Sequence, residues 1–102
     1  MVYNKLVRDK IPSIIKSNGQ NPSSRILAEE EYTVALEQKL DEEVSEYHQD
    51  KNLEELADIL EVVYALAENL GHSREELLEA YERKHHERGG FRDRIFLISN
   101  DG

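Results

Sequence analysis

Residues 53–70 constrain the fold most, because their apolar side chains surround most of the circumference of a predicted helix. A helix of this kind has to be buried on several sides. Its apolar residues are Leu53, Leu56, Ile59, Leu60, Val62, Val63, Leu66, Ala67 and Leu70. The rest of a 102-residue chain offers too little surface to cover this helix. We therefore expect a homo-oligomer, most simply a dimer and otherwise a tetramer.

Helical periodicity continues through most of the remaining chain. In the segment 29–48, one helix face carries Leu36, Leu40, Val44 and Tyr47. Four helices are predicted in all, over residues 12–17, 29–48, 53–70 and 74–88.

Turn and capping residues separate these helices. Gly71 is suited to end the third helix, and Ser73 with Glu76 forms a capping box for the fourth. Because the connector at residues 50–52 is short, the second and third helices should form an antiparallel hairpin. The sequence thus predicts an all-α fold, an antiparallel bundle of about four helices in a single domain spanning residues 1–102. Residues 95–98 form either a short β-strand or an extended segment packed on a helix.

The net charge of −9 argues against binding to a nucleic-acid polymer, which requires neutralisation of phosphates. No apolar run approaches the roughly 18 residues that cross a bilayer. The N-terminus lacks the apolar stretch of a signal peptide. The absence of cysteine excludes disulfides and Cys-based zinc sites. We expect a cytoplasmic protein that contacts neither membranes nor nucleic-acid polymers.

Acidic side chains concentrate in residues 29–68, which hold 14 Asp and Glu and only two Lys. In helical projection, Glu43 lies on the apolar side of its helix and Glu46 lies at the margin of that side. Glu55 and Asp58 follow one another along a stripe of the next helix. A carboxylate facing apolar neighbours is costly unless it is paired or binds a cation. Four facing carboxylates predict an all-oxygen site for Mg²⁺ or Mn²⁺, the alternative being an ordinary solvated acidic face.

Neighbouring residues refine this prediction. Glu61, one turn after Asp58, is a further candidate ligand, whereas Glu42 points away from the core and is expected in solvent. No Lys follows the four carboxylates at i+4, so the usual helix-stabilising ion pairs are expected to be absent.

Residues 42–46 (EEVSE) and 54–60 (EELADIL) together resemble the EExxE…ExxD signature of the MazG-like all-α nucleoside triphosphate pyrophosphohydrolases. Residues 3–12 (YNKLVRDKIP) and 88–91 (RGGF) are similar to the small phosphoribosyl-ATP pyrophosphohydrolase-like branch. The likeness spans nearly the whole chain, although the gap between the two acidic motifs is shorter than in longer MazG proteins.

The resemblance implies Mg²⁺-dependent hydrolysis of a nucleotide between its α- and β-phosphates, in a nucleotide-pool house-cleaning role. It implies metal ligands at Glu43, Glu46, Glu55 and Asp58, with Glu43 or Glu46 orienting the attacking water as a general base. One alternative is the phosphoribosyl-ATP pyrophosphohydrolase of histidine biosynthesis. Another is a non-catalytic helical module that binds metal or nucleotide.

Polar and basic residues near both ends of the chain, together with one glycine, then become candidates for contacting substrate phosphates. They are Asn4, Lys5, Arg8, Lys10, Lys84, Arg88, Gly90 and Arg94. Tyr3 and Phe91 flank these residues and are candidates for stacking on a nucleobase, whereas the helical tyrosines are expected in the core or at an interface.

Overall fold

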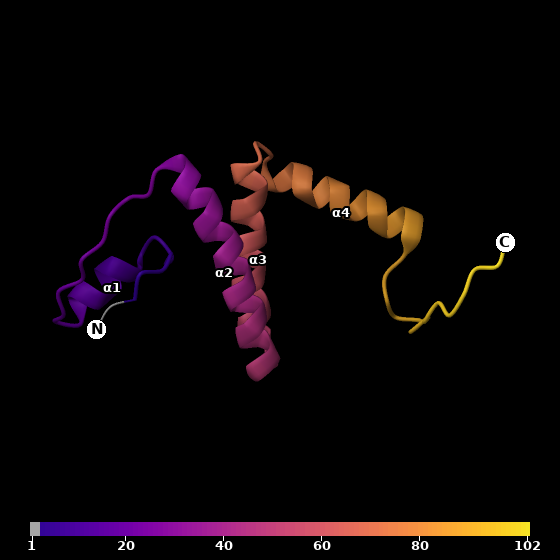
Figure 1. The fold of residues 1–102 in the computed structure, drawn as a ribbon, viewed down its shortest axis with the longest axis horizontal. Helices are drawn as coiled ribbons and strands as arrows, with labels where there is room; N and C mark the ends of the chain where they lie inside the picture. Colours follow the sequence, from indigo (N-terminus) through magenta and orange to yellow (C-terminus); the bar gives the residue numbers. More distant parts are fainter. Residues whose placement is uncertain (1–2) are drawn as a thin grey trace.

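A computed structural model describes residues 3–102 and contains four α-helices, with no β-strand in that range (Figure 1). The helices are α1 (Ile11–Ser17), α2 (Glu29–Gln49), α3 (Leu53–Asn69) and α4 (Arg74–Arg88). The predicted all-α class is confirmed. Within the described range, no helix is both long and apolar enough to cross a membrane.

Helices α2 and α3 form the predicted hairpin and pack along each other (Figure 1). At the closed end, the Asn52 side chain caps α3 by accepting a hydrogen bond of 3.0 Å from the backbone N–H of Glu55. At the open end, the Asn69 amide donates to the Thr33 hydroxyl at 3.0 Å. Polar contacts therefore lie at both ends of the hairpin.

The core of the chain is small. Leu36 of α2 is 2% exposed, and Val62 and Ala67 of α3 are also buried. Val44, predicted on the core face of α2, is exposed, and so are Leu56 and Leu60 of α3. Among the four described helices, only α2 lies along the length of α3, so a large part of the apolar circumference of α3 is left open by them.

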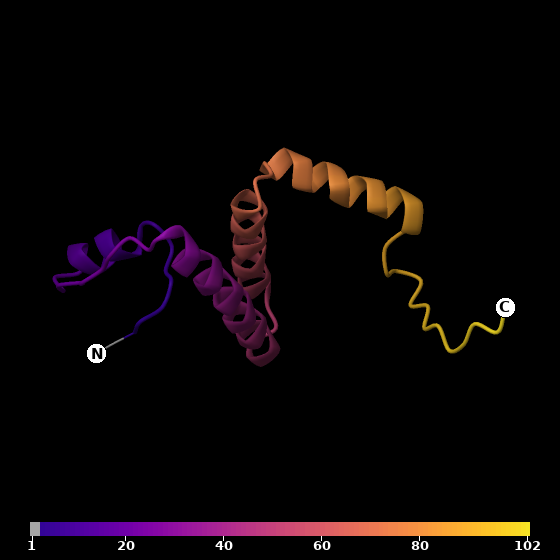
Figure 2. The ribbon, with the colours of Figure 1, turned by 45° about the horizontal axis from the view of Figure 1, so that its top comes forward.

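Two adjacent caps set the direction of α4. The backbone N–H groups of Gly71 and His72 donate to the carbonyls of Glu68 and Ala67 at 2.9 and 3.0 Å, and Gly71 has a φ of +93°. This Schellman geometry needs a residue that tolerates the left-handed region, as the sequence predicted for Gly71. The predicted capping box follows directly, with Ser73 and Glu76 exchanging hydrogen bonds of 2.9 and 3.1 Å. Helix α4 leaves the hairpin at this turn and extends away from it (Figure 2).

Residues 91–98 contain neither helix nor strand; after α4 the chain turns and then runs on, separate from the hairpin (Figure 1). Phe91 is 96% exposed, and Ile95, Phe96, Leu97 and Ile98 are exposed as well. The predicted alternatives, a short β-strand or a segment packed on a helix, are both absent within residues 3–102. A strand needs a neighbouring strand to receive its backbone hydrogen bonds, and the described part of the chain supplies none.

Candidate metal and phosphate site

Three of the four predicted metal ligands converge across the hairpin. Glu43 projects from α2, while Glu55 and Asp58 project from α3, and one carboxylate oxygen from each lies within 4.8 Å of the others. The i, i+3 spacing places Glu55 and Asp58 on one side of α3, and the antiparallel pairing turns that side toward Glu43. We refer to these three residues as the acidic cluster.

Glu46, the fourth predicted ligand, groups instead with Glu42 and Glu43, with one oxygen from each within 4.8 Å of the others. In helical projection Glu46 lies between Glu42 and Glu43, which explains why it sits on that side of α2. The four predicted ligands therefore fall into two overlapping groups that share Glu43, rather than into one group of four.

Glu43 is the most enclosed charged residue among those described, being 6% exposed. Its Oε1 lies 3.2 Å from the Lys39 ammonium, whereas its Oε2 is buried and accepts no hydrogen bond. Oε2 of Glu55 is likewise buried without a partner. Two carboxylate oxygens of one cluster thus lack the hydrogen bonds that buried polar atoms normally receive.

The environment of the cluster opposes its negative charge. Burial raises the pKa of Glu43, and the charges of Glu46 and Asp58 raise it further, against the opposing effect of Lys39. Burial also raises the pKa of Glu55, together with the charges of Asp58 and Glu43. These shifts mean that the ionised cluster would be stabilised by additional positive charge.

Lys39 is a residue of this site that the sequence analysis missed. Its side chain is 15% exposed, and its ammonium lies 3.3 Å from Glu42 as well as 3.2 Å from Glu43. The expectation that helix-type ion pairs are absent was wrong, because it considered only lysines that follow a carboxylate, whereas Lys39 precedes Glu43 by four residues. That spacing was readable in the sequence.

Glu42 is also placed differently from the prediction. It is half-buried rather than solvated, and its two oxygens pair with Lys5 and Lys39 at 3.3 Å each. Burial raises the pKa of Glu42, but hydrogen bonds and charge from the two lysines outweigh this effect and lower the pKa overall. Glu42 pairs with lysines from two elements because residues 3–8 pass beside α2.

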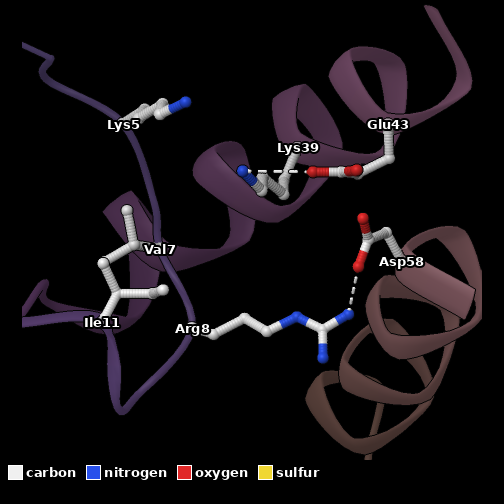
Figure 3. Close-up of a pocket in the computed structure, with 7 residues that line it drawn as sticks. All are labelled: Lys5, Val7, Arg8, Ile11, Lys39, Glu43 and Asp58. Carbon is white, nitrogen blue, oxygen red and sulfur yellow. Dashed lines mark hydrogen bonds and ion pairs between the residues drawn. The ribbon is translucent and has the colours of Figure 1, made fainter. Parts of the chain in front are cut away.

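The N-terminal segment carries two of the predicted phosphate-binding residues to the acidic cluster. The Arg8 guanidinium donates to Asp58 and lies 3.9 Å from Glu61, and Lys5 pairs with Glu42. Figure 3 shows Lys39 pointing toward Glu43 and Arg8 pointing toward Asp58. A pocket of about 270 Å³ lies between these groups. It is lined by Lys5, Val7, Arg8, Ile11, Lys39, Glu43 and Asp58.

The remaining predicted phosphate-binding residues do not reach this pocket within one chain. Asn4 and Lys10 are exposed and do not line it, although they lie on the same N-terminal segment. The other four are on α4 or the residues that follow it, and Figure 2 shows this region extending away from the hairpin. They are Lys84, Arg88, Gly90 and Arg94.

The two candidates for base stacking are also separated. Tyr3 lies near the pocket residue Lys5, whose ammonium is 6.0 Å from the Tyr3 ring centroid. Phe91 follows α4 and is exposed. One chain therefore presents carboxylates, three bases and an aromatic ring at one place, and a second group of bases with an aromatic ring at another.

Comparisons with known proteins add little to this site. No family model matches the sequence, and no solved structure matches it. A curated relative from Mycolicibacterium smegmatis, described as an uncharacterized protein, is 52% identical over 42 residues. This match covers 41% of the present chain and 43% of the relative, so the chain spans less than half of the length of that protein. The likeness carries no assignment of family or activity.

Proposed function

We propose that this protein hydrolyses a nucleoside triphosphate, or a related nucleotide, between its α- and β-phosphates in the presence of Mg²⁺ or Mn²⁺. The products are a nucleoside monophosphate and pyrophosphate. The proposed role of this reaction is house-cleaning of the nucleotide pool. The observation that carries the proposal is the buried, unpartnered Oε2 of Glu43, which lies in a cluster with a second unpartnered carboxylate oxygen from Glu55.

The residues present fit a hard divalent cation. All ligands of the acidic cluster are carboxylate oxygens, which Mg²⁺ and Mn²⁺ prefer. Glu43, Glu55 and Asp58 would hold the ion, and Glu46 would extend the set from the neighbouring group. The same ion would replace the hydrogen bonds that Glu43 Oε2 and Glu55 Oε2 lack.

A triphosphate carries about four negative charges, and a chain with a net charge of −9 repels it unless cations intervene. A bound divalent ion neutralises charge on the phosphates and lowers the pKa of the attacking water. From the chain itself, Lys5 and Arg8 line the pocket and are suited to bind phosphate oxygens. Glu43 or Glu46 would accept the proton from water as the bridging P–O bond breaks.

The first test is pyrophosphate release from a panel of canonical, deoxy and damaged nucleoside triphosphates and phosphoribosyl-ATP, with Mg²⁺ or with EDTA. We expect release that requires the metal and favours one class of nucleotide. A preference for phosphoribosyl-ATP would indicate the enzyme of histidine biosynthesis instead. Metal binding without release from any nucleotide would contradict the enzyme and favour a non-catalytic module.

The second test is Glu43→Gln, with Glu37→Gln as the matched control. Both residues are on α2, but Glu37 is exposed and lies outside the pocket. We expect Glu43→Gln to lose at least 100-fold in turnover, a loss typical of removing one group that acts in the transition state, while its far-UV circular dichroism is unchanged. Glu37→Gln should retain wild-type turnover. Full turnover in Glu43→Gln would show that the ligands are assigned wrongly.

A further inference from the structure

The candidate metal site contains two carboxylate groups, and they share Glu43. The first group, Glu42, Glu43 and Glu46, lies entirely on α2, and the second group is the acidic cluster. A carboxylate shared between two sets of ligands can bridge a pair of metal ions, which lie about 3.5–4 Å apart in two-metal sites. The number of ions that this chain binds therefore depends on which positive charges the two groups already contain.

The first group is already paired with lysines. The Lys39 ammonium lies 3.3 Å from one oxygen of Glu42 and 3.2 Å from Oε1 of Glu43, so it bridges two of the three carboxylates. The Lys5 ammonium lies 3.3 Å from the other oxygen of Glu42. A positive charge is thus present at the position that a metal ion in this group would occupy.

The acidic cluster is different, because two of its buried oxygens still lack partners. Among the described residues, Oε2 of Glu43 and Oε2 of Glu55 are the buried side-chain oxygens that accept no hydrogen bond. The two oxygens of Glu43 therefore differ, since Oε1 pairs with Lys39 and Oε2 has no partner. Buried carboxylate oxygens without hydrogen bonds are costly, so the acidic cluster is the group that a divalent ion would stabilise.

The charges of the two groups also balance with a single ion. The groups contain five carboxylates, and three basic side chains pair with them, which leaves two negative charges. The bases are Lys5, Arg8 and Lys39. One divalent ion neutralises the remaining charge. A second ion would lie close to the Lys39 ammonium, which is only 15% exposed, and positive charges in such a partly buried place repel each other strongly.

We propose that the Lys39 ammonium takes the place of a second divalent ion, so that each chain binds one ion, at the acidic cluster. This inference rests on the metal ion of the proposed function, but it does not depend on the reaction. A lysine suits this position because its ammonium is a compact charge with three donors, which can serve both Glu42 and Glu43. Lys39 also lines the same pocket as Lys5 and Arg8, the residues proposed to bind phosphate.

The bound ions can be counted without turnover by titrating the chain with Mn²⁺ in the absence of nucleotide. Free Mn²⁺ gives a sharp electron paramagnetic resonance signal that broadens on binding, so the lost signal reports the bound ions. We expect one ion per chain in wild type and two ions per chain in Lys39→Met. Lys5→Met is the matched control and should bind one ion, because it removes a lysine from Glu42 but leaves Lys39 in place.

Two ions per chain in wild type would overturn the inference, and so would one ion per chain in a folded Lys39→Met. Far-UV circular dichroism establishes whether each variant is folded. Lys39→Gln is a second variant in case Lys39→Met does not fold, because it removes the charge but keeps an N–H donor for the carboxylates. It should likewise bind two ions per chain, and a folded Lys39→Gln with one ion would also contradict the inference.

A further pair of variants tests where the additional ion binds. Glu42 belongs to the first group and not to the acidic cluster. Glu42→Gln alone should therefore still bind one ion per chain. Combined with Lys39→Met, it should reduce the number of bound ions from two to one. Two ions in the double variant would place the additional ion elsewhere and overturn the exchange between Lys39 and a metal ion.

Ion counting and turnover separate this inference from the proposed function. One ion per chain in a wild type that releases no pyrophosphate would contradict the reaction and support the inference. Two ions per chain in an active wild type would overturn the inference alone. A folded wild type that binds no Mn²⁺ would overturn both.

Discussion

At the residue scale, the central residue of the site is Glu43, which is buried although it carries a carboxylate. One oxygen of its carboxylate faces the Lys39 ammonium and the other is buried without a partner. Such a group is stable as an anion only while positive charge remains close. Lys39 supplies that charge from within the same helix, and Arg8 supplies it to Asp58 from the N-terminal segment.

Replacing Lys39 by methionine should therefore destabilise the fold at neutral pH. The substitution keeps the apolar stem but leaves Glu42 and Glu43 without a shared cation, and we expect a loss of about 1–3 kcal/mol in the free energy of unfolding. Because Mg²⁺ can replace the lost charge, it should raise the melting temperature of Lys39→Met more than that of wild type. Lys16→Met, at an exposed lysine of α1, is the control. An equal effect of Mg²⁺ on Lys39→Met and wild type would contradict this role of Lys39.

Glu31 offers a separate test of charge at the start of α2. Its carboxylate accepts a fork of hydrogen bonds from Arg25 at 2.7 and 3.1 Å and one from the Ala28 N–H, which together lower its pKa to about 2. Since the pKa is lower in the folded state, the pair contributes stability above the ordinary glutamate pKa and loses it as the pH falls through about 2.

In an NMR titration, the carboxyl carbon of Glu31 should thus show a midpoint near 2 in wild type. In Arg25→Met the midpoint should move toward the ordinary value, because the largest cause of the shift is removed. The same midpoint in both proteins would mean that the fork does not persist in solution.

At the element scale, the helices follow their sequence signals closely. The capping box at Ser73, the glycine after α3 and the short connector at residues 50–52 all act through neighbouring residues, so the sequence alone was enough to predict them. Helical spacing also predicted that Glu43, Glu55 and Asp58 would meet. The contacts of Lys5 and Arg8 join elements far apart in sequence, and no local pattern could specify their partners.

The capping box provides the test at this scale. Ser73→Ala removes the acceptor for the Glu76 N–H and should cost about 1 kcal/mol in stability. Because the cap lies at the start of α4, we expect α4 to be the first helix to unfold when Ser73→Ala is warmed. Ser24→Ala, at an exposed loop position, is the control in thermal melts followed by circular dichroism. Equal melting temperatures for both variants would contradict the contribution of the cap.

At the scale of the whole molecule, the main feature is the apolar circumference of α3. The sequence predicted that one chain could not cover this helix, and the structure leaves Leu53, Leu56 and Leu60 exposed. The tail was harder to interpret, because residues 95–98 lack both a strand partner and a packing partner inside the chain. A local sequence pattern therefore could not assign its conformation, because no described neighbour within the chain fixes it.

Leu56→Glu directly tests the exposed apolar surface of α3 formed by Leu53, Leu56 and Leu60. If a second copy covers this surface, as the predicted homo-oligomer requires, a charge there should reduce the mass in light scattering to that of one chain and lower the melting temperature. Ile26→Glu, which introduces the same charge at an exposed loop position, should leave the mass unchanged. Retention of the dimer in Leu56→Glu would place the interface elsewhere.

The short connector between α2 and α3 also has a kinetic consequence. Most contacts of the hairpin join residues close in sequence, and such local structure forms within microseconds to milliseconds. If the chain assembles as the predicted homo-oligomer, that association has no such shortcut, since two chains have to collide first. Folding would therefore begin as a first-order event and finish as a second-order one, and dilution would delay the finish without changing the start.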